Sequence, residues 1–270
     1  MRQEAYFCTV KELDELGKNN IPRQLISHTH LIYSSPATLA FNSPGAEGFG
    51  VKRAGLAVPD SVMLIVSPGC CGRNTSVLSS MRAYQDRFYY LLMDETDIVT
   101  GRHLKKIPKA VAEICEGLKK KPSVVMICIT CVDALLGTDM ERVCHKAEEY
   151  AGVPVRPCYM YALTREGRKP PMVHVRQSVY SLLEPKKKKG NVVNLLGYFS
   201  PLTDDCELYD LLHGAGVKTI HEISRCKDYA QYQTMSEANF NLVLHPEARF
   251  AAEDFHDRLK IPYIELRRLY

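Results

Sequence analysis

Two short apolar runs in this chain each lead directly into a turn that carries cysteine. The run over residues 62–66 is followed by the turn 67–72, which contains Cys70 and Cys71, and a second run is followed by Thr130 and Cys131. Short apolar runs bounded by turn residues are typical of buried strands. Because ligands collect at the carboxyl ends of parallel strands, thiols on these turns are expected to converge on one crevice. Thiolates that converge usually hold a metal or react.

Strand-like and helix-like segments alternate along the rest of the sequence. In the first part we predict strands over 61–67, 123–130 and 153–158 and helices over 75–92, 104–118 and 140–150. In the second part we predict strands over 192–197, 218–223, 241–244 and 263–265 and helices over 206–213, 229–238 and 249–259. Such alternation favours parallel sheets with crossover helices. The sequence therefore predicts an α/β protein made of two consecutive Rossmann-like units.

A run of four lysines, Lys186 to Lys189, separates the two predicted units. It follows Pro185 and precedes Gly190, and a new strand begins shortly afterwards. We therefore predict an N-terminal domain over 1–185, a basic linker over 186–190 and a second domain over 191–270. Much of the net charge of +4 comes from this run. A single charge run is more often a solvated linker than a nucleic-acid patch, so we expect no nucleic-acid partner.

The composition is that of a soluble globular protein. The 270 residues are 46% hydrophobic and 24% charged, and we see no signal peptide and no apolar run of the roughly 20 residues that a membrane span needs. We therefore expect a cytoplasmic protein without a membrane partner. Ten cysteines in that setting indicate reduced thiols, metal ligation or core packing rather than a disulfide framework. No G-x-G-x-x-G opens a helix after a strand, so a dinucleotide site has little support.

Several motifs, taken in order, resemble nitrogenase component 1 and its relatives. They are the segments 50–55, 62–66, 67–72, 96–101, 130–139, 194–197, 241–244 and 261–265. The relatives include the dark-operative protochlorophyllide and chlorophyllide reductases and the nickel-tetrapyrrole reductase of methanogens. No single motif is decisive, but their order makes chance a poor explanation. The resemblance covers about residues 45–270.

This resemblance implies a three-domain α/β protein that pairs with a similar subunit. Cysteines from both partners would ligate an iron–sulfur cluster at the junction, either [4Fe-4S] or a larger cluster shared across a homo- or heterodimer. An ATP-dependent iron protein would deliver electrons singly, and the cluster would pass them to a substrate-reducing site. The sequence does not indicate the substrate.

The same resemblance implies which cysteines hold the cluster. Of the three cysteine positions usual in such a subunit, Cys71 falls on the second and Cys131 on the third, while residues 42–45, where the first is expected, contain no cysteine. Cys70 is adjacent to Cys71, and Cys158 ends a predicted strand, so either one is a candidate for the missing ligand. Cys128 and Cys131 also form a C-x-x-C pair, but no second pair at zinc-site spacing accompanies them, and we expect Cys128 to lie in the core.

The second unit departs further from nitrogenase. Where the nitrogenase cofactor subunit has a cysteine that anchors its metal cofactor, this chain has His245, which is followed by Pro246. A histidine there is a possible metal ligand or a turn residue. The sequence ends where the family would continue into a third domain, which we interpret as a split or a shortened subunit. We do not expect dinitrogen reduction by this chain alone.

These observations lead to one hypothesis of function with two alternatives. The first is an iron–sulfur oxidoreductase subunit that accepts electrons from an ATP-dependent iron protein and passes them to an unidentified substrate. The alternative is a non-catalytic scaffold for cluster or tetrapyrrole assembly, or a regulatory partner of a full-length relative. A metal-free binding domain follows if the cysteines only pack. The acidic residues 94–97 are expected to cap a helix rather than to carry catalytic protons.

Overall fold

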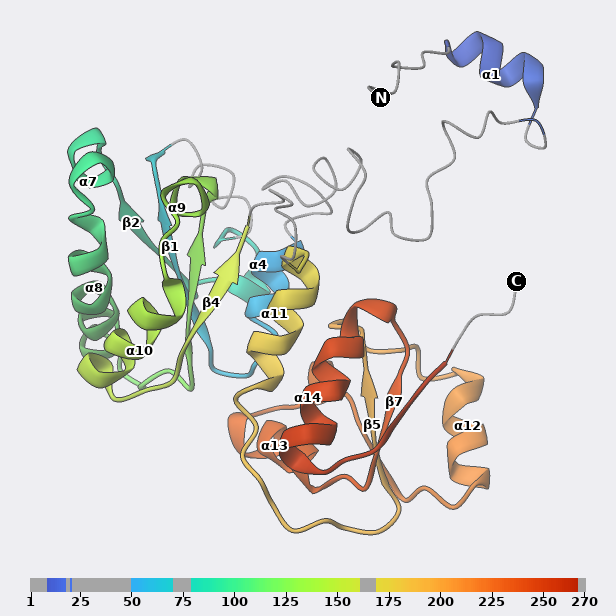
Figure 1. Cartoon of the computed structure of the whole chain (residues 1–270). Helices are drawn as coiled ribbons and strands as arrows, with labels where there is room; N and C mark the ends of the chain where they lie inside the picture. The colour runs from blue at the N-terminus through green and yellow to red at the C-terminus, as the bar shows by residue number, and fades with distance from the viewer. Residues whose placement is uncertain (1–8, 18–19, 21–49, 70–78, 161–168, 267–270) are drawn as a thin grey trace.

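The computed structural model describes residues 9–17, 20, 50–69, 79–160 and 169–266. Within them the chain forms two four-stranded parallel sheets, one after the other (Figure 1). The prediction of two consecutive parallel-sheet units with crossover helices is therefore confirmed. The division at 185 and 190 stays a prediction, and residues 184–190 form neither helix nor strand.

The first sheet has the strand order β2-β1-β3-β4. Its strands are β1 (Val62–Ser67), β2 (Phe88–Leu92), β3 (Val125–Ile129) and β4 (Val155–Tyr159). Its helices are α4 (Gly50–Gly55), α7 (Glu95–Thr100), α8 (His103–Gly117), α9 (Cys131–Leu136), α10 (Met140–Ala151) and α11 (Pro171–Tyr180). A separate helix, α1 (Val10–Leu16), precedes them.

The second sheet has the strand order β6-β5-β7-β8. Its strands are β5 (Val192–Leu196), β6 (Thr219–His221), β7 (Phe240–Val243) and β8 (Tyr263–Glu265). The connecting helices are α12 (Glu207–Gly214), α13 (Tyr229–Gln233) and α14 (Arg249–Leu259), with a short 3₁₀ turn, η7 (Pro246–Ala248), after β7. The predicted bounds of α14 and β8 agree with those of the structure.

The helix predicted over residues 75–92 is wrong in its described part. Residues 79–92 contain a 3₁₀ turn at Arg82–Tyr84 and the edge strand β2, which pairs in parallel with β1 from Met63↔Phe88 to Ser67↔Leu92. The open edge of β1 gives the apolar residues of this segment a strand partner, and that pairing outweighs their local helical spacing. Residues 75–78 lie outside the described residues.

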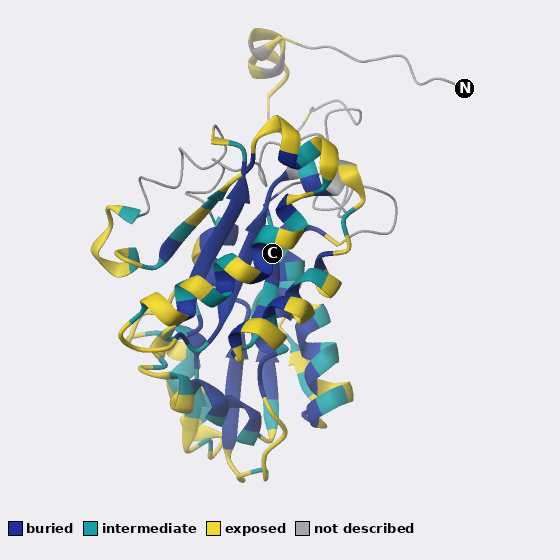
Figure 2. Cartoon of the chain, turned by 90° about the vertical axis from the view of Figure 1, so that its left-hand side faces the viewer, coloured by how far each residue is buried: buried dark blue, intermediate teal, exposed yellow. Residues whose placement is uncertain are grey.

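Both faces of the first sheet are covered, so its central strands are buried throughout (Figure 2). On one face, Val62, Leu64 and Val66 of β1 pack with residues of α8 and α10. On the other face, Met63 and Ile65 pack toward α4 and α11. Burial on two faces explains why these strands are continuous apolar runs without polar alternation.

The core on the α4 and α11 side continues into the second unit without a break. One cluster of buried residues includes Met63 of β1, Val179 of α11, Leu196 of β5 and Phe255 of α14. Helix α11 packs against α4, β4 and α14, which places it between the two sheets (Figure 1). The two units therefore share one hydrophobic core, although their sheets are separate.

Polar groups in the middle and at the C-terminal end of α11 connect it to the second unit. Arg176 is buried and donates two hydrogen bonds to the carbonyl oxygen of Gly197, at 3.0 and 2.7 Å, and its Nη1 lies 2.7 Å from Oε2 of Glu247. At the C-terminal end of α11, the Val179 and Tyr180 carbonyls accept hydrogen bonds from side chains of the second unit. These contacts satisfy carbonyls that a helix end leaves without an intrahelical partner.

Among the described residues, no helix is both long and apolar enough to cross a membrane.

Replacing Arg176 with methionine is expected to lower the free energy of unfolding by about 3–5 kcal/mol, because it leaves a largely buried Glu247 carboxylate without its cation. Lys120→Met is the control: Lys120 is 76% exposed and pairs with Asp60, which is itself 38% exposed, so the expected loss is below about 1 kcal/mol. Urea unfolding of both variants provides the measurement. Equal losses in the two variants would contradict the structural role given to Arg176.

Candidate functional site

The carboxyl ends of the four strands in the first sheet form one edge, which carries the predicted cysteine turns. Strand β1 is paired with β3 in the register Val66↔Ile129, so the two strands end next to each other. Backbone hydrogen bonds continue the strand pairing one residue beyond β2 and β4. The amide of Met93 donates to the Ser67 carbonyl at 3.0 Å, and the amide of Met160 donates to the Ile129 carbonyl at 3.1 Å. The strands that precede the cysteines therefore end side by side, and the convergence of their thiols stays a prediction.

The four predicted ligands differ in how far the structure describes them. Cys70 and Cys71 lie outside the described residues. Cys131 is the first residue of α9, directly after β3, and its side chain lies outside the described part of the chain. Cys158 is described in full.

Cys158 lies in the core on the α4 and α11 side of the first sheet, opposite Cys128 in the β3–β4 register. Both side chains are fully buried and both are free thiols. The Cys158 thiol donates to the carbonyl of Val51 at 3.5 Å. A hydrogen bond with Cys128, together with burial, holds the pKa of Cys158 well above its ordinary value. These contacts are those of a packed, neutral thiol, and the ligand role of Cys158 stays a prediction.

Two buried hydroxyl groups lie at the ends of the adjacent strands β1 and β3. Neither Oγ of Ser67 nor Oγ1 of Thr130 has a hydrogen-bond partner within the described residues. Hydrogen bonds to the sulfur atoms are one of the ways in which proteins tune an iron–sulfur cluster. Because Cys70, Cys71 and Cys131 follow these two strands in the sequence, the hydroxyl donors at this edge fit such a cluster. The described residues alone contain no group of three or more His, Cys, Asp or Glu side chains placed to hold a metal ion.

A buried hydrogen-bond chain lies behind this edge, between α7, α8 and α9. The His103 ring contacts the carbonyl oxygen of Asp97 through Nδ1 at 3.0 Å and the Oδ1 atom of Asp133 through Nε2 at 2.9 Å. Thr138 adds a hydrogen bond from its Oγ1 to the same Oδ1 atom at 3.2 Å. The sequence does not indicate this hydrogen-bond network, because His103 and Asp133 lie 30 residues apart and neither belongs to a predicted helix or strand.

Asp97 is the second anionic centre behind the edge. Its carboxylate accepts hydrogen bonds of 2.7 Å from both Lys106 and Arg102, which lower the pKa of Asp97 to about 2. Asp94 is the N-cap residue of α7, and the amide of Asp97 donates to its carboxylate at 2.6 Å. The expectation that the acidic residues 94–97 cap a helix therefore agrees with the structure.

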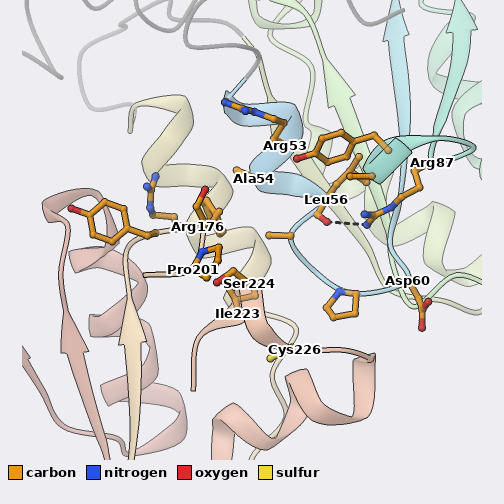
Figure 3. Close-up of a pocket in the computed structure, with 18 of the residues that line it drawn as sticks. Arg53, Ala54, Leu56, Asp60, Arg87, Arg176, Pro201, Ile223, Ser224 and Cys226 are labelled. Carbon is orange, nitrogen blue, oxygen red and sulfur yellow. Dashed lines mark hydrogen bonds between the residues drawn. The ribbon is translucent and has the colours of Figure 1, made fainter. Parts of the chain in front are cut away.

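A cavity of about 840 Å³ lies between the two units. Figure 3 shows Arg53 and Ala54 of α4 on one side, Arg176 of α11 at its wall, and Pro201 and Ser224 from the turns that follow β5 and β6. Sequence reasoning did not find this cavity, because its lining comes from segments of both units that no motif connects.

His245 lies at the end of β7, close to this cavity but outside its lining. It caps η7, and its Nδ1 accepts a hydrogen bond from the amide of Glu247 at 3.3 Å. Burial lowers the pKa of His245. Gly197, with a φ of +134°, approaches so closely that a Cβ atom there would lie 2.7 Å from the His245 amide nitrogen. In this structure His245 has the contacts of a turn residue.

Comparison with known proteins identifies the family. Residues 47–270 match the model of the nitrogenase component 1 type oxidoreductases, so this chain belongs to that family. The resemblance inferred from the motif order is thereby confirmed.

The chain is also similar to curated proteins named nitrogenase iron-molybdenum cofactor biosynthesis protein NifE. It is 26% identical over 217 residues to the one from Nostoc sp. (strain PCC 7120), with 77% of this chain and 44% of that protein covered. The identity to the protein from Rhizobium meliloti (strain 1021) is 27% over 224 residues, with 80% and 47% covered. The chain spans about half the length of the curated relatives it matches.

Among solved structures, the chain is similar to one titled "Nitrogenase Cp1 at pH 6.5". The TM-score is 0.60 at 17% sequence identity, with 81% of this chain and 52% of that chain covered. A second structure, "Nitrogenase Cp1 at pH 5", gives a TM-score of 0.56 at 21% identity, with 79% and 46% covered. At these identities the likeness shows a shared fold.

Replacing Asp97 with asparagine is expected to flatten the pH dependence of stability between about pH 4 and pH 2. Folding lowers the pKa of this carboxyl group from 3.8 to about 2, so the unfolded chain takes up the proton first as the pH falls. The stability that Asp97 contributes is therefore complete above about pH 4 and is lost as the pH falls toward 2.

Urea unfolding of the wild type and Asp97→Asn at a series of pH values measures this difference. The exposed Asp205 offers a control, since Asp205→Asn is expected to keep the wild-type slope. An unchanged slope in Asp97→Asn would show that the ion pairs with Lys106 and Arg102 do not stabilise the fold.

Proposed function

We propose that this chain is the cluster-holding unit of an iron–sulfur assembly of the nitrogenase component 1 type. The observation that carries the proposal is the adjacency of β1 and β3, whose carboxyl ends lead into the turn with Cys70 and Cys71 and into Cys131. In this proposal Cys71 and Cys131 are ligands, and Cys70 or Cys158 replaces the ligand that residues 42–45 lack. Thiolates are the usual protein ligands of iron–sulfur clusters.

Three cysteines from this chain leave a four-iron cluster incompletely ligated, so the proposal includes a partner. A homologous subunit, either a second copy or a related chain, would supply the remaining thiolates across a two-fold or pseudo-two-fold axis. The cluster is then [4Fe-4S] or a larger one shared by the two chains. Its chemistry when bound is one-electron transfer, and an ATP-dependent iron protein is the proposed donor.

The contribution of this chain's own residues is to position the ligands and to adjust the surroundings of the cluster. The parallel pairing of β1 with β3 places the ends of these two strands next to each other. The hydroxyl groups of Ser67 and Thr130, which have no acceptor among the described residues, are available to donate to sulfur at this edge. Such hydrogen bonds would raise the reduction potential of a bound cluster, because they stabilise its more negative, reduced state.

A second candidate function is that of a scaffold in metal-cofactor assembly. It is favoured by the names of the curated relatives, which are cofactor biosynthesis proteins. It is also compatible with His245, whose contacts are those of a turn residue where the family resemblance places a cofactor-anchoring cysteine. The scaffold uses the same cluster edge but passes its metal cargo to another protein instead of reducing a substrate.

Alanine at Cys71 or Cys131 is expected to reduce bound iron and sulfide from stoichiometric amounts to near zero after anaerobic purification or reconstitution. Cys144→Ala is the matched control, because Cys144 is buried on α10 and faces the opposite side of the sheet from Cys158. Iron and acid-labile sulfide per chain are measured together with the absorption spectrum before and after dithionite. Retention of full iron in both Cys71→Ala and Cys131→Ala would remove these ligands from the proposal. Cys70→Ala and Cys158→Ala then show which residue completes the set.

The fate of the bound cluster distinguishes the two candidate functions. A scaffold is expected to transfer ⁵⁵Fe from the loaded chain to an acceptor protein of the same family in its apo form, with loss of label from the donor. An electron-transfer subunit is expected to keep its label and to be re-oxidised by substrate after reduction. Transfer of label at the rate of free iron release would count against the scaffold.

A further inference from the structure

The buried hydrogen bond between His103 and Asp133 joins α8 to α9 immediately behind the predicted ligand Cys131. We propose that His103 and Asp133 are positioning residues, which hold the first turn of α9 in place and thereby fix where residue 131 lies at the cluster edge. This inference rests on the proposed function, because it concerns a ligand of the proposed cluster. It assigns a role to two residues that are not among the predicted ligands.

The geometry of the pair is that of a fixed link. Nε2 of His103 lies 2.9 Å from Oδ1 of Asp133, and the two side chains are 1% and 0% exposed. The opposite ring nitrogen of His103 lies 3.0 Å from the Asp97 carbonyl oxygen. The imidazole ring therefore cannot turn without breaking a hydrogen bond on either side, and breaking one inside the core is costly.

Asp133 also contacts Thr138, which lies just after the end of α9. The amide of Thr138 donates to the Asp133 carbonyl oxygen at 3.0 Å, and the Thr138 hydroxyl donates to Oδ1 at 3.2 Å. The second carboxylate oxygen, Oδ2, has no partner within the described residues. Oδ1 thus accepts two hydrogen bonds, one from His103 in α8 and one from Thr138, which follows α9 in the chain.

A helix as short as α9 needs such a connection. It has six residues, Cys131–Leu136, and an isolated helix of that length is not stable in water. Its neighbour α8 is much longer, with 15 residues, and its apolar side packs on the sheet. The His103–Asp133 hydrogen bond attaches the first turn of α9 to α8, whose own position is fixed. The attachment point, Asp133, is two residues from Cys131.

The position of α8 is fixed in turn by charges around its beginning. Arg102 and Lys106 both bind the Asp97 carboxylate, and Asp97 belongs to α7. Side-chain contacts therefore link α7 to α8 and α8 to α9. Because α7 follows β2 and α9 follows β3, these contacts also link the ends of the two strands. Residues that orient the ligands of a metal centre typically change its retention by 10–100-fold when they are replaced.

The test compares His103→Leu with a matched core variant, Val111→Ala. Val111 is buried on the same helix, α8, and packs only in the apolar core, so its truncation lowers stability without changing the link to α9. Asp133→Asn is the conservative variant, since its amide oxygen can still accept a hydrogen bond at Oδ1, and Asp133→Leu removes that acceptor.

Iron release from the anaerobically reconstituted protein to the chelator bathophenanthroline disulfonate is measured for all four variants, together with the absorption spectrum and thermal unfolding. We expect release to be about tenfold faster or more in His103→Leu and Asp133→Leu. Val111→Ala and Asp133→Asn are expected to release iron within about twofold of the wild-type rate. Release from His103→Leu that is no faster than from Val111→Ala at equal thermal stability would overturn the positioning role.

A second readout separates this inference from the proposed function. If the wild type binds no iron, the proposed cluster is absent, and the alkylation rate of Cys131 by iodoacetamide then tests positioning on its own. His103→Leu is expected to change that rate several-fold, whereas Val111→Ala is expected to leave it near the wild-type value. Equal alkylation rates in the wild type and His103→Leu would overturn the positioning role even without a cluster.

Discussion

The buried guanidinium group of Arg176 holds the two parallel sheets in their relative position. It lies on α11 between the sheets, donates to the Gly197 carbonyl at the end of β5, and pairs with Glu247 in the turn after β7. The planar group also lies over the ring of Phe199, 5.0 Å from its centroid. A guanidinium group has five donors in a fixed arrangement, so few relative positions of α11 and the second sheet satisfy it. An unpaired charge in this place would be costly, and the geometry is correspondingly well determined.

The shared hydrophobic core also holds the two sheets in their relative position, and it does so over a larger area than Arg176. Because α11 packs on α4 and β4 on one side and on α14 on the other, the first and second units do not have independent cores. The cavity between the units is lined from both sides, and its shape depends on this arrangement. The cysteine edge is different in this respect, since the first sheet alone determines its strand order and register.

Particular elements show how far sequence patterns can be trusted here. The apolar runs at 62–66 and 192–196 predicted β1 and β5 well, because a buried parallel strand leaves a continuous apolar run. The segment that forms β2 was predicted as a helix, because its strand character depends on pairing with β1, 25 residues away in the register. His103 and Asp133 could not be paired from sequence either. No local pattern indicates that a residue at the start of α8 contacts one in α9.

The sequence by itself determined the class of the fold, the family and the places where cysteines follow strands, because all three depend on local order along the chain. The tertiary structure alone decided which strands are neighbours, that Cys158 packs beside Cys128 in the core, and that a cavity lies between the units. Strands buried on both faces have no polar alternation, so the sequence does not show which face a given side chain is on. That choice is made only when helices from distant parts of the chain cover the two faces.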